Sequence, residues 1–268
     1  HFFASAVIAP VIIIAIWASL WATRKAPKET APSHASLRSM ALLVYQNKPF
    51  MRLVLLYGLM TMAIATITAG LPFAAIYLIF DGEASFLSAM SKNLGTLSFL
   101  FAAFVIGAMC SQIFWVFLSN IFGKSAALIA GLSAYIMLLF ILFYALPSTN
   151  ITTMFILFLL AGITNGAYQQ IPWAMYPDLM DQTRVQFGEA IEGAFSAVWL
   201  FGQKVANAIA PGFLAIILGI YGFQSSTMGK IEQPDQALTA LKAMVTVVPA
   251  AFLFFAILGL IFAHRRNK

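Results

Sequence analysis

The sequence has very little charge for its length, and this scarcity excludes most soluble architectures. Charged residues make up 9% of the 268 residues, whereas hydrophobic residues make up 62%. A soluble domain carries about 25% charged residues, because its surface must be solvated. Lipid must therefore face much of this chain. Runs of about 20 apolar residues, the length at which a helix spans a bilayer, recur along the sequence, and the alternation of a transmembrane β-barrel does not appear.

Residue types that bind metals or carry out catalysis are also scarce. Cys110 is the only cysteine, so it has no partner for an internal disulfide. The three histidines, His1, His34 and His264, are dispersed along the chain and form no metal-ligand spacing. No nucleophile and base form a recognisable pair. The sequence therefore predicts no enzyme, no metal site and no cofactor.

What the sequence does contain is a series of apolar segments of helical length. The seven predicted helices are Phe2–Trp21, Phe50–Phe80, Leu94–Leu118, Ala126–Leu146, Ile151–Tyr176, Ile191–Tyr221 and Ala243–His264. The expected fold is therefore all-α and transmembrane, with seven spans.

A long polar connection separates the first of these helices from the other six. We expect residues 1–22 to be the last helix of an N-terminal bundle and residues 23–49 to be a cytoplasmic inter-domain loop. Residues 50–268 would then form a six-helix C-terminal bundle of two groups of three. Major facilitator transporters have this construction, with inverted three-helix repeats in each half.

The lysines and arginines are divided unevenly between the two sides that seven spans define. The richer side holds Arg24, Lys25, Lys28, Arg38, Lys48, Arg52, Lys124, Arg184, Arg265, Arg266 and Lys268. The other side holds Lys92, Lys230 and Lys242. The positive-inside rule predicts an inner or plasma membrane protein whose N-terminus is outside and whose C-terminus is cytoplasmic. This distribution explains the net charge of +6 without a nucleic-acid partner.

Lys204 is the most informative polar residue, because it lies in the middle of the predicted span 191–221. A charge at the bilayer centre costs roughly 3 kcal/mol on insertion scales, so this ammonium group must face protein or water. Gln203 and Asn207 lie beside it. The three residues suit the wall of a transport cavity, and a structural lysine paired with a neighbouring acid is the alternative. An acidic partner would have to come from a missing half, a partner chain or a ligand.

The predicted span 151–176 carries a second polar set in an apolar background. Its members are Asn165, Tyr168, Gln169, Gln170 and Trp173. Amides and aromatic rings together suit a hydroxylated ligand, which they can hydrogen-bond and stack against. Interhelical hydrogen bonds and an interfacial aromatic belt are the alternatives.

The connection that follows this span concentrates charged residues. They are Asp178, Asp181, Arg184, Glu189 and Glu192. We interpret them as a charge-paired cytoplasmic gate, and a solvated loop is the alternative. The segment that leads into this connection, from Ile171 to Asp181, reads Ile-Pro-Trp-Ala-Met-Tyr-Pro-Asp-Leu-Met-Asp.

This segment resembles the glycoside–pentoside–hexuronide:cation symporter family, the melibiose-permease-like branch of the major facilitator superfamily. That family has a proline-tryptophan-alanine-methionine stretch here, followed by two aspartates three residues apart. Its later glutamate-glycine and glutamine-lysine pairs are matched by Glu192-Gly193 and Gln203-Lys204. Further matches occur in order at Asn47–Phe50, Phe122–Lys124 and Gln233–Leu238. The chain departs from the family pattern at Asn120, Gln182, Arg184 and Ile191.

The resemblance implies the C-terminal half of a secondary transporter that moves a sugar or glycoside together with H⁺ or Na⁺ by alternating access. The implied partners are a small-molecule substrate, the bilayer and a missing N-terminal half or partner chain. One alternative is a non-transporting membrane subunit that reuses the fold in a larger complex. Another is a transporter whose cargo is a lipid or other amphiphile.

Overall fold

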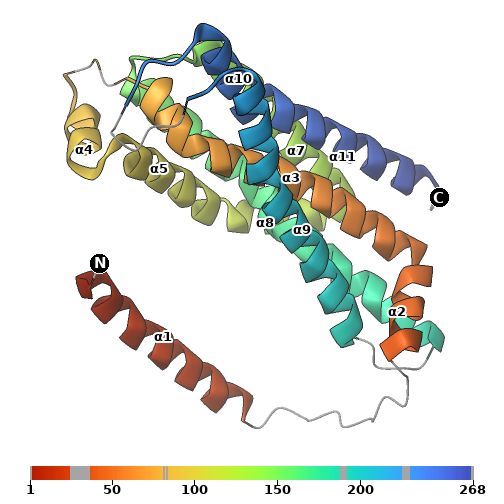
Figure 1. The fold of residues 1–268 in the computed structure, drawn as a ribbon. Coiled ribbons are helices and arrows are strands. Elements are labelled where there is room, and N and C mark those ends of the chain that lie inside the picture. The colour runs from red at the N-terminus through yellow and green to blue at the C-terminus, as the bar shows by residue number, and fades with distance from the viewer. Residues whose placement is uncertain are drawn as a thin grey trace. The chain divides into compact units, whose positions relative to one another are not determined.

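The computed structural model describes the backbone of residues 2–24, 37–80, 82, 84–187, 192–224 and 230–266 (Figure 1). Side-chain surroundings are described for residues 9–24, 42–80, 82, 84–181, 193–224 and 230–262. Contacts divide the chain into two compact units, His1–His34 and Ala35–Lys268, and each is considered by itself.

The first unit contains one helix, α1, which extends from Phe2 to Thr23 and includes Pro10. Within its described part, large apolar side chains are exposed all round the helix, and Trp17 and Trp21 are among them. A helix that is apolar on every face is typical of a membrane span or of a helix buried in a larger protein.

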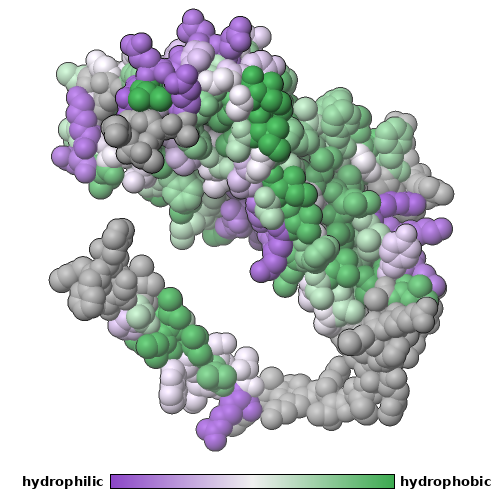
Figure 2. Space-filling model, in the orientation of Figure 1, coloured by the Kyte–Doolittle hydropathy of each residue, from purple (hydrophilic) through white to green (hydrophobic). Residues whose placement is uncertain are grey.

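The second unit is a bundle of helices joined mostly by short connections. Its elements are α2 (Leu37–Gln46), α3 (Lys48–Tyr77), α4 (Phe86–Leu94), α5 (Thr96–Cys110), α6 (Gln112–Phe122), α7 (Lys124–Ala145), α8 (Ile151–Phe187), α9 (Glu192–Ile220), α10 (Asp235–Val245) and α11 (Val247–Arg266). The long helix α3 packs against α9 and α11, and α8 packs against α5 and α7. Figure 2 shows hydrophilic atoms gathered at the two ends of this bundle, with a hydrophobic belt between them.

The helical membrane architecture predicted from the sequence is confirmed. Among the described residues, five segments are long and apolar enough to cross a membrane, and the number rises to six if a bent pair counts as one span. The segments Ala9–Thr23 and Gln112–Phe122 are shorter apolar helices. The predicted all-α, major-facilitator-type bundle therefore agrees with the structure.

Several predicted helices differ from the observed ones at their ends and breaks. The predicted span 94–118 is divided at Ser111 into α5 and α6, and α4 meets α5 at an angle of 111°. Gly95 forms that bend with a φ of +82°, a conformation that glycine adopts without a Cβ clash. The predicted last span begins earlier, at Asp235, and breaks at Thr246 between α10 and α11.

Helix α8 continues to Phe187, well beyond its predicted end at Tyr176. Pro172 and Pro177 lie inside it. A proline removes one backbone hydrogen bond, but packing against neighbouring helices tolerates it in membrane proteins. The extension places the first acids of the predicted loop on a helix.

Glycine allows α5 and α8 to approach closely. A Cβ atom added to Gly107 would meet the carbonyl oxygen of Leu159, and one added to Gly162 would meet the carbonyl oxygen of Phe104. Backbones this close exclude any side chain at these positions, as in other small-residue helix contacts in membranes. This close contact holds α8 against α5, and α8 also packs against α7.

Candidate functional site

The hydroxyl group of Tyr57 on α3 is the centre of a polar contact that joins three helices. The indole Nε1 of Trp173 on α8 donates to this oxygen at 3.1 Å, and Nε2 of Gln203 on α9 donates to it at 3.0 Å. Tyr57 is only 2% exposed, so water does not compete for these bonds in the described structure. Hydrogen bonds in such a setting fix geometry, because an unpaired buried donor is costly.

The rings around this hydroxyl group form an aromatic cluster, which consists of Tyr57, Tyr168, Trp173, Tyr176 and Trp199. Tyr57 stacks between Trp199, at a centroid distance of 4.2 Å, and Tyr168, at 5.6 Å. The indole of Trp173 meets the rings of Tyr57 and Trp199 edge-on. Offset stacks and edge-to-face pairs add about 0.5–1.5 kcal/mol each beyond burial.

Helical spacing explains how the sequence places these side chains. Trp199 and Gln203 lie one turn apart on α9, so they share the face that packs against α3. On α3, Thr61 lies one turn after Tyr57; its hydroxyl donates to the carbonyl oxygen of Tyr57 and also contacts the hydroxyl of Tyr168 at 3.0 Å. The predicted residues Tyr168, Trp173 and Gln203 are therefore brought together around Tyr57.

Lys204 and Asn207 lie on α9 close to Gln203 in sequence, but among the described residues no hydrogen bond or ring contact joins either of them to this cluster. Both are exposed on the surface of the bundle, whereas the neighbouring Gln203 is half-buried. Figure 2 shows a hydrophilic patch where α9 crosses the hydrophobic belt. Among the residues whose side chains are described, Lys204 has no ion pair, because Lys124 and Asp178 form the only one. A charge at this depth needs a partner or water, so this face of α9 suits the wall of a cavity.

The amides of α8 do not form one continuous site. Asn165 is 1% exposed, and neither its Nδ2 nor its Oδ1 has a hydrogen-bond partner among the described residues. Gln169 is exposed, and Gln170 is half-buried with its Oε1 lacking a partner within the same part of the chain. Buried amides without partners are rare, so Asn165 is a place where a bound water or ligand group would be stabilising.

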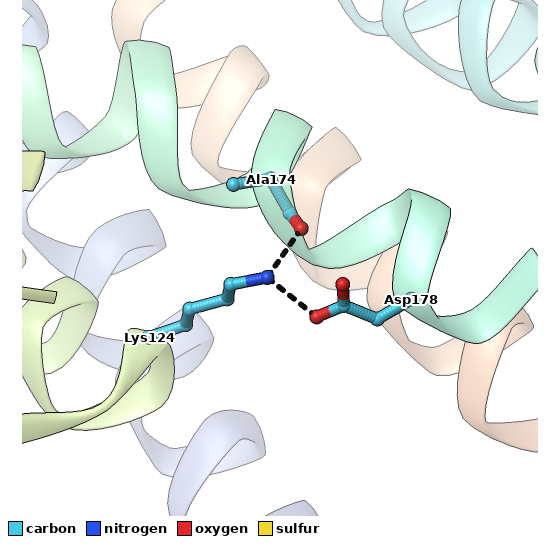
Figure 3. Close-up of polar contacts among 3 residues, drawn as sticks. All are labelled: Lys124, Ala174 and Asp178. Atoms are coloured by element: carbon cyan, nitrogen blue, oxygen red, sulfur yellow. Dashed lines mark hydrogen bonds and ion pairs between the residues drawn. The ribbon is translucent and has the colours of Figure 1, made fainter. Parts of the chain in front are cut away.

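At the end of the bundle near α2, Lys124 joins the start of α7 to α8. Its Nζ lies 2.6 Å from Oδ2 of Asp178 and donates to the carbonyl oxygen of Ala174 at 2.9 Å (Figure 3). Asp181 is exposed one turn further along α8. The side chains of the other predicted gate residues, Arg184, Glu189 and Glu192, lie outside the described residues. The described part of the predicted gate is thus an ion pair between Asp178 and a lysine of another helix.

A small apolar cavity lies apart from the aromatic cluster, between α3, α5, α7 and α8. Its volume is about 60 Å³. Ile67, Phe104, Leu138 and Phe158 are among the side chains that line it. Small-molecule sites usually measure about 300–1,000 Å³, so this cavity is too small to hold a transported molecule on its own.

Tyr57, Trp199 and Lys124 were not among the residues predicted for the site. Tyr57 and Trp199 stand in apolar runs, where a single aromatic residue is as compatible with lipid contact as with a polar cluster. Lys124 entered the sequence analysis through the positive-inside distribution and the Phe122–Lys124 match to the family, and not as a residue of the site. Among the described residues, no group of three histidines, cysteines or acids is placed to hold a metal ion.

Residues 2–264 match the family described as MFS/sugar transport protein, where MFS denotes the major facilitator superfamily. The sodium-dependent lysophosphatidylcholine symporter 1 of Gallus gallus is 27% identical over 158 residues, which cover 58% of this chain and 29% of the chicken protein. An uncharacterized symporter of Synechocystis is 33% identical over 116 residues, 42% of this chain and 21% of that protein.

A sphingosine-1-phosphate transporter of Xenopus tropicalis is 24% identical over 160 residues, which cover 59% of this chain and 30% of that protein. The matched region thus spans less than a third of these relatives. The family match confirms the resemblance predicted from the motifs around Pro172 and Gln203, and it confirms that the family consists of transporters rather than enzymes. The chain is therefore a multi-pass membrane protein that belongs to the MFS/sugar transport family of the major facilitator superfamily.

Proposed function

We propose that this chain is the C-terminal half of a cation-coupled symporter that moves an amphiphile with a phosphate-containing head and a hydrocarbon tail by alternating access. The observation that carries this cargo class is the similarity to proteins named as lysophosphatidylcholine and sphingosine-1-phosphate transporters. The word sodium in the first name favours Na⁺ over H⁺ as the coupling ion. The sugar cargo expected from the sequence becomes the second candidate.

The charge and position of Lys204 support this proposal. In transporters of this architecture, the substrate binds near the bilayer midplane between the two halves. Lys204 and Asn207 lie on an exposed face of α9 and in the middle of a span. An ammonium group and an amide at this depth would bind the phosphate of an amphiphile, and the neighbouring apolar surface would receive its tail. Coulombic attraction is strong there because little water screens it.

The predicted topology and domain organisation form part of the same proposal. Residues 1–22 would be the last helix of the N-terminal bundle, 23–49 the cytoplasmic inter-domain loop and 50–268 the C-terminal bundle. The Lys124–Asp178 pair would then face the cytoplasm and hold α7 and α8 together as part of the gate. The predicted N-terminus lies outside and the C-terminus in the cytoplasm, as the positive-inside rule requires.

A sugar or glycoside is the second candidate cargo, and a specific observation favours it. The aromatic cluster combines ring faces with the amide of Gln203 and the indole of Trp173, groups that suit a hydroxylated ligand. The family description also includes sugar transport. In the described structure, however, these groups bond to one another through Tyr57, so a sugar would have to displace Gln203 or Trp173 from its present bond.

The test is uptake by the purified full-length protein in sealed vesicles with an imposed Na⁺ or H⁺ gradient. Radiolabelled lysophosphatidylcholine and a labelled galactoside are supplied in separate reactions. We expect gradient-dependent uptake of the lysophospholipid and none of the galactoside. Uptake of the galactoside alone would reject the amphiphile. Absence of both, together with co-purification in a stable multi-subunit assembly, would reject transport and support a non-transporting subunit.

A further inference from the structure

A groove of about 470 Å³ lies between α9 and α10, away from the aromatic cluster and from Lys204. One wall is a ridge that runs along the end of α9 into the turn after it and consists of Phe213, Ile217 and Tyr221 at intervals of four residues. The other wall is a ridge on α10, which consists of Asp235, Thr239 and Ala243 at the same interval. Residues four apart lie on one face of a helix, so each ridge runs along the groove.

The groove is polar at one end and apolar at the other. Helix α9 ends at Ile220 beside the start of α10 at Asp235, so Tyr221 and Asp235 lie together at the mouth (Figure 1). Phe213 and Ala243 lie about two turns deeper, where the walls are apolar. The mouth thus lies where α9 ends and α10 begins, and apolar side chains line the deeper part of the groove.

Two hydrogen bonds join the chain segments on either side of the mouth of the groove. The backbone nitrogen of Gln224 donates to Oε1 of Gln233 at 2.9 Å, and Nε2 of Gln233 donates to the carbonyl oxygen of Gln224 at 2.8 Å. These two bonds join the segment that follows α9 to the segment that precedes α10. The spacing between Tyr221 and Asp235 is therefore fixed by the fold, which makes the mouth a preformed feature.

The carboxylate of Asp235 is exposed, and it forms no ion pair with any residue whose side chain the structure describes. The two described lysines nearest to it in sequence contact aromatic rings: Lys230 lies over Phe80, 4.8 Å from the ring centroid, and Lys242 lies over Phe143, at 4.4 Å. An acid in the first turn of α10 also interacts favourably with the helix dipole. This interaction explains why an acid begins α10. It does not explain why an aromatic ring and apolar side chains lie beside that acid.

From this arrangement we propose that the groove binds a phospholipid of the bilayer whose head carries an ammonium group. The ammonium group pairs with the carboxylate of Asp235 and lies against the ring of Tyr221, which is 48% exposed. One acyl chain lies along Phe213, Ile217 and Ala243. A volume of about 470 Å³ is in the usual range for small-molecule sites, roughly 300–1,000 Å³. This lipid is a resident ligand rather than cargo, so its binding does not depend on transport.

The binding is measured by native mass spectrometry of the full protein in detergent, titrated with phosphatidylethanolamine or phosphatidylglycerol that carry the same acyl chains. Only the first head has an ammonium group. We expect phosphatidylethanolamine to bind roughly fivefold more tightly. This ratio of dissociation constants corresponds to the free energy that a partly exposed ion pair contributes. Asp235→Asn should abolish this preference, whereas Glu232→Gln, which removes an exposed acid of the segment before α10 and outside the groove, should keep it.

A second pair of variants tests the tail. Ala243→Phe fills the deeper part of the groove and should weaken the binding of both lipids. Ala215→Phe adds the same ring to an exposed position on α9 outside the groove, so it should leave the binding of both lipids unchanged. Equal binding of the two lipids by the unaltered protein, or an unaltered preference in Asp235→Asn, would overturn the proposal. So would a dimer in the same spectra that Ala243→Phe dissociates, because the groove would then be an interface between two copies.

Discussion

The rings of Tyr57 and Trp199 stack with their centroids 4.2 Å apart and their planes 10° apart, and this stack joins α3 to α9. The hydroxyl group of the same tyrosine accepts hydrogen bonds from Trp173 of α8 and Gln203 of α9. One side chain thus links the helix that presents Lys204 to two other helices. If the proposed alternating access moves α9 relative to α3, this contact must break or the two helices must move together.

Tyr57→Phe separates the hydrogen bonds from the stack, because phenylalanine keeps the ring and removes the oxygen. The partly buried donors on Trp173 and Gln203 then lose their acceptor, which should lower stability by about 0.5–1.5 kcal/mol. We expect thermal unfolding in detergent to occur a few degrees lower, and uptake to slow more than expression falls. Tyr144→Phe is the control, because Tyr144 is 83% exposed. Equal melting temperatures for Tyr57→Phe and the unaltered protein would contradict the role of the hydroxyl group.

The role of the Lys124–Asp178 ion pair in the proposed gate can be tested by reversing its charges. An ion pair that is 39% and 56% exposed contributes little to stability, typically about 0–1 kcal/mol, so an effect on melting should be small. If the pair holds α7 and α8 in one state of the gate, Lys124→Asp and Asp178→Lys should each reduce the rate of uptake several-fold. The double variant should recover part of that rate, because the opposite charges face each other again.

Asp181→Lys is the matched control for this experiment, since Asp181 is an exposed acid of the same helix and does not pair with Lys124. Combined with Lys124→Asp, it should give no recovery. A double-mutant cycle on uptake rates measures the coupling directly. A coupling energy of zero for Lys124 and Asp178 would show that the pair is an incidental surface contact.

The close contact of α5 and α8 predicts a strong effect of a very small substitution. Gly162→Ala places a methyl group against the carbonyl oxygen of Phe104, a backbone atom that cannot rotate away. We expect a loss of about 1–3 kcal/mol in stability, as for other overpacked sites. At Gly58, in α3, an added Cβ meets nothing within 4 Å, so Gly58→Ala should be neutral or stabilising by up to about 1 kcal/mol. Similar melting temperatures for the two variants would contradict this packing.

Sequence reasoning predicted the long helices well because composition and length determine them. A bilayer requires about 20 apolar residues per span, and α3, α7 and α9 supply them. The breaks at Ser111 and Thr246 were not predicted, because a serine or threonine can hydrogen-bond back to its own helix and is therefore compatible with an unbroken span. Such breaks depend on packing against other helices, as at Gly166, where an added Cβ would meet the side chain of Ser111.

The candidate site was predicted in part. Gln203 and Tyr168 stood out as polar groups in spans where polar groups are costly, and the structure brings both to Tyr57. Tyr57 and Trp199 did not stand out, because an aromatic residue gains free energy equally well in a core, in a belt or against lipid. Their roles follow only from which helices become neighbours, and the sequence of one helix does not contain that information.

Lys204 provides the sharpest test of the proposed transport pathway. Lys204→Ala removes a charge that costs roughly 3 kcal/mol at mid-membrane, so insertion and expression should not fall. If this ammonium group binds the cargo head or a coupling acid of the other half, gradient-driven uptake should nevertheless be lost. Lys92→Ala, which removes an exposed lysine of α4, is the control and should transport normally. Uptake at unaltered rates by Lys204→Ala would show that α9 places this charge for packing and not for transport.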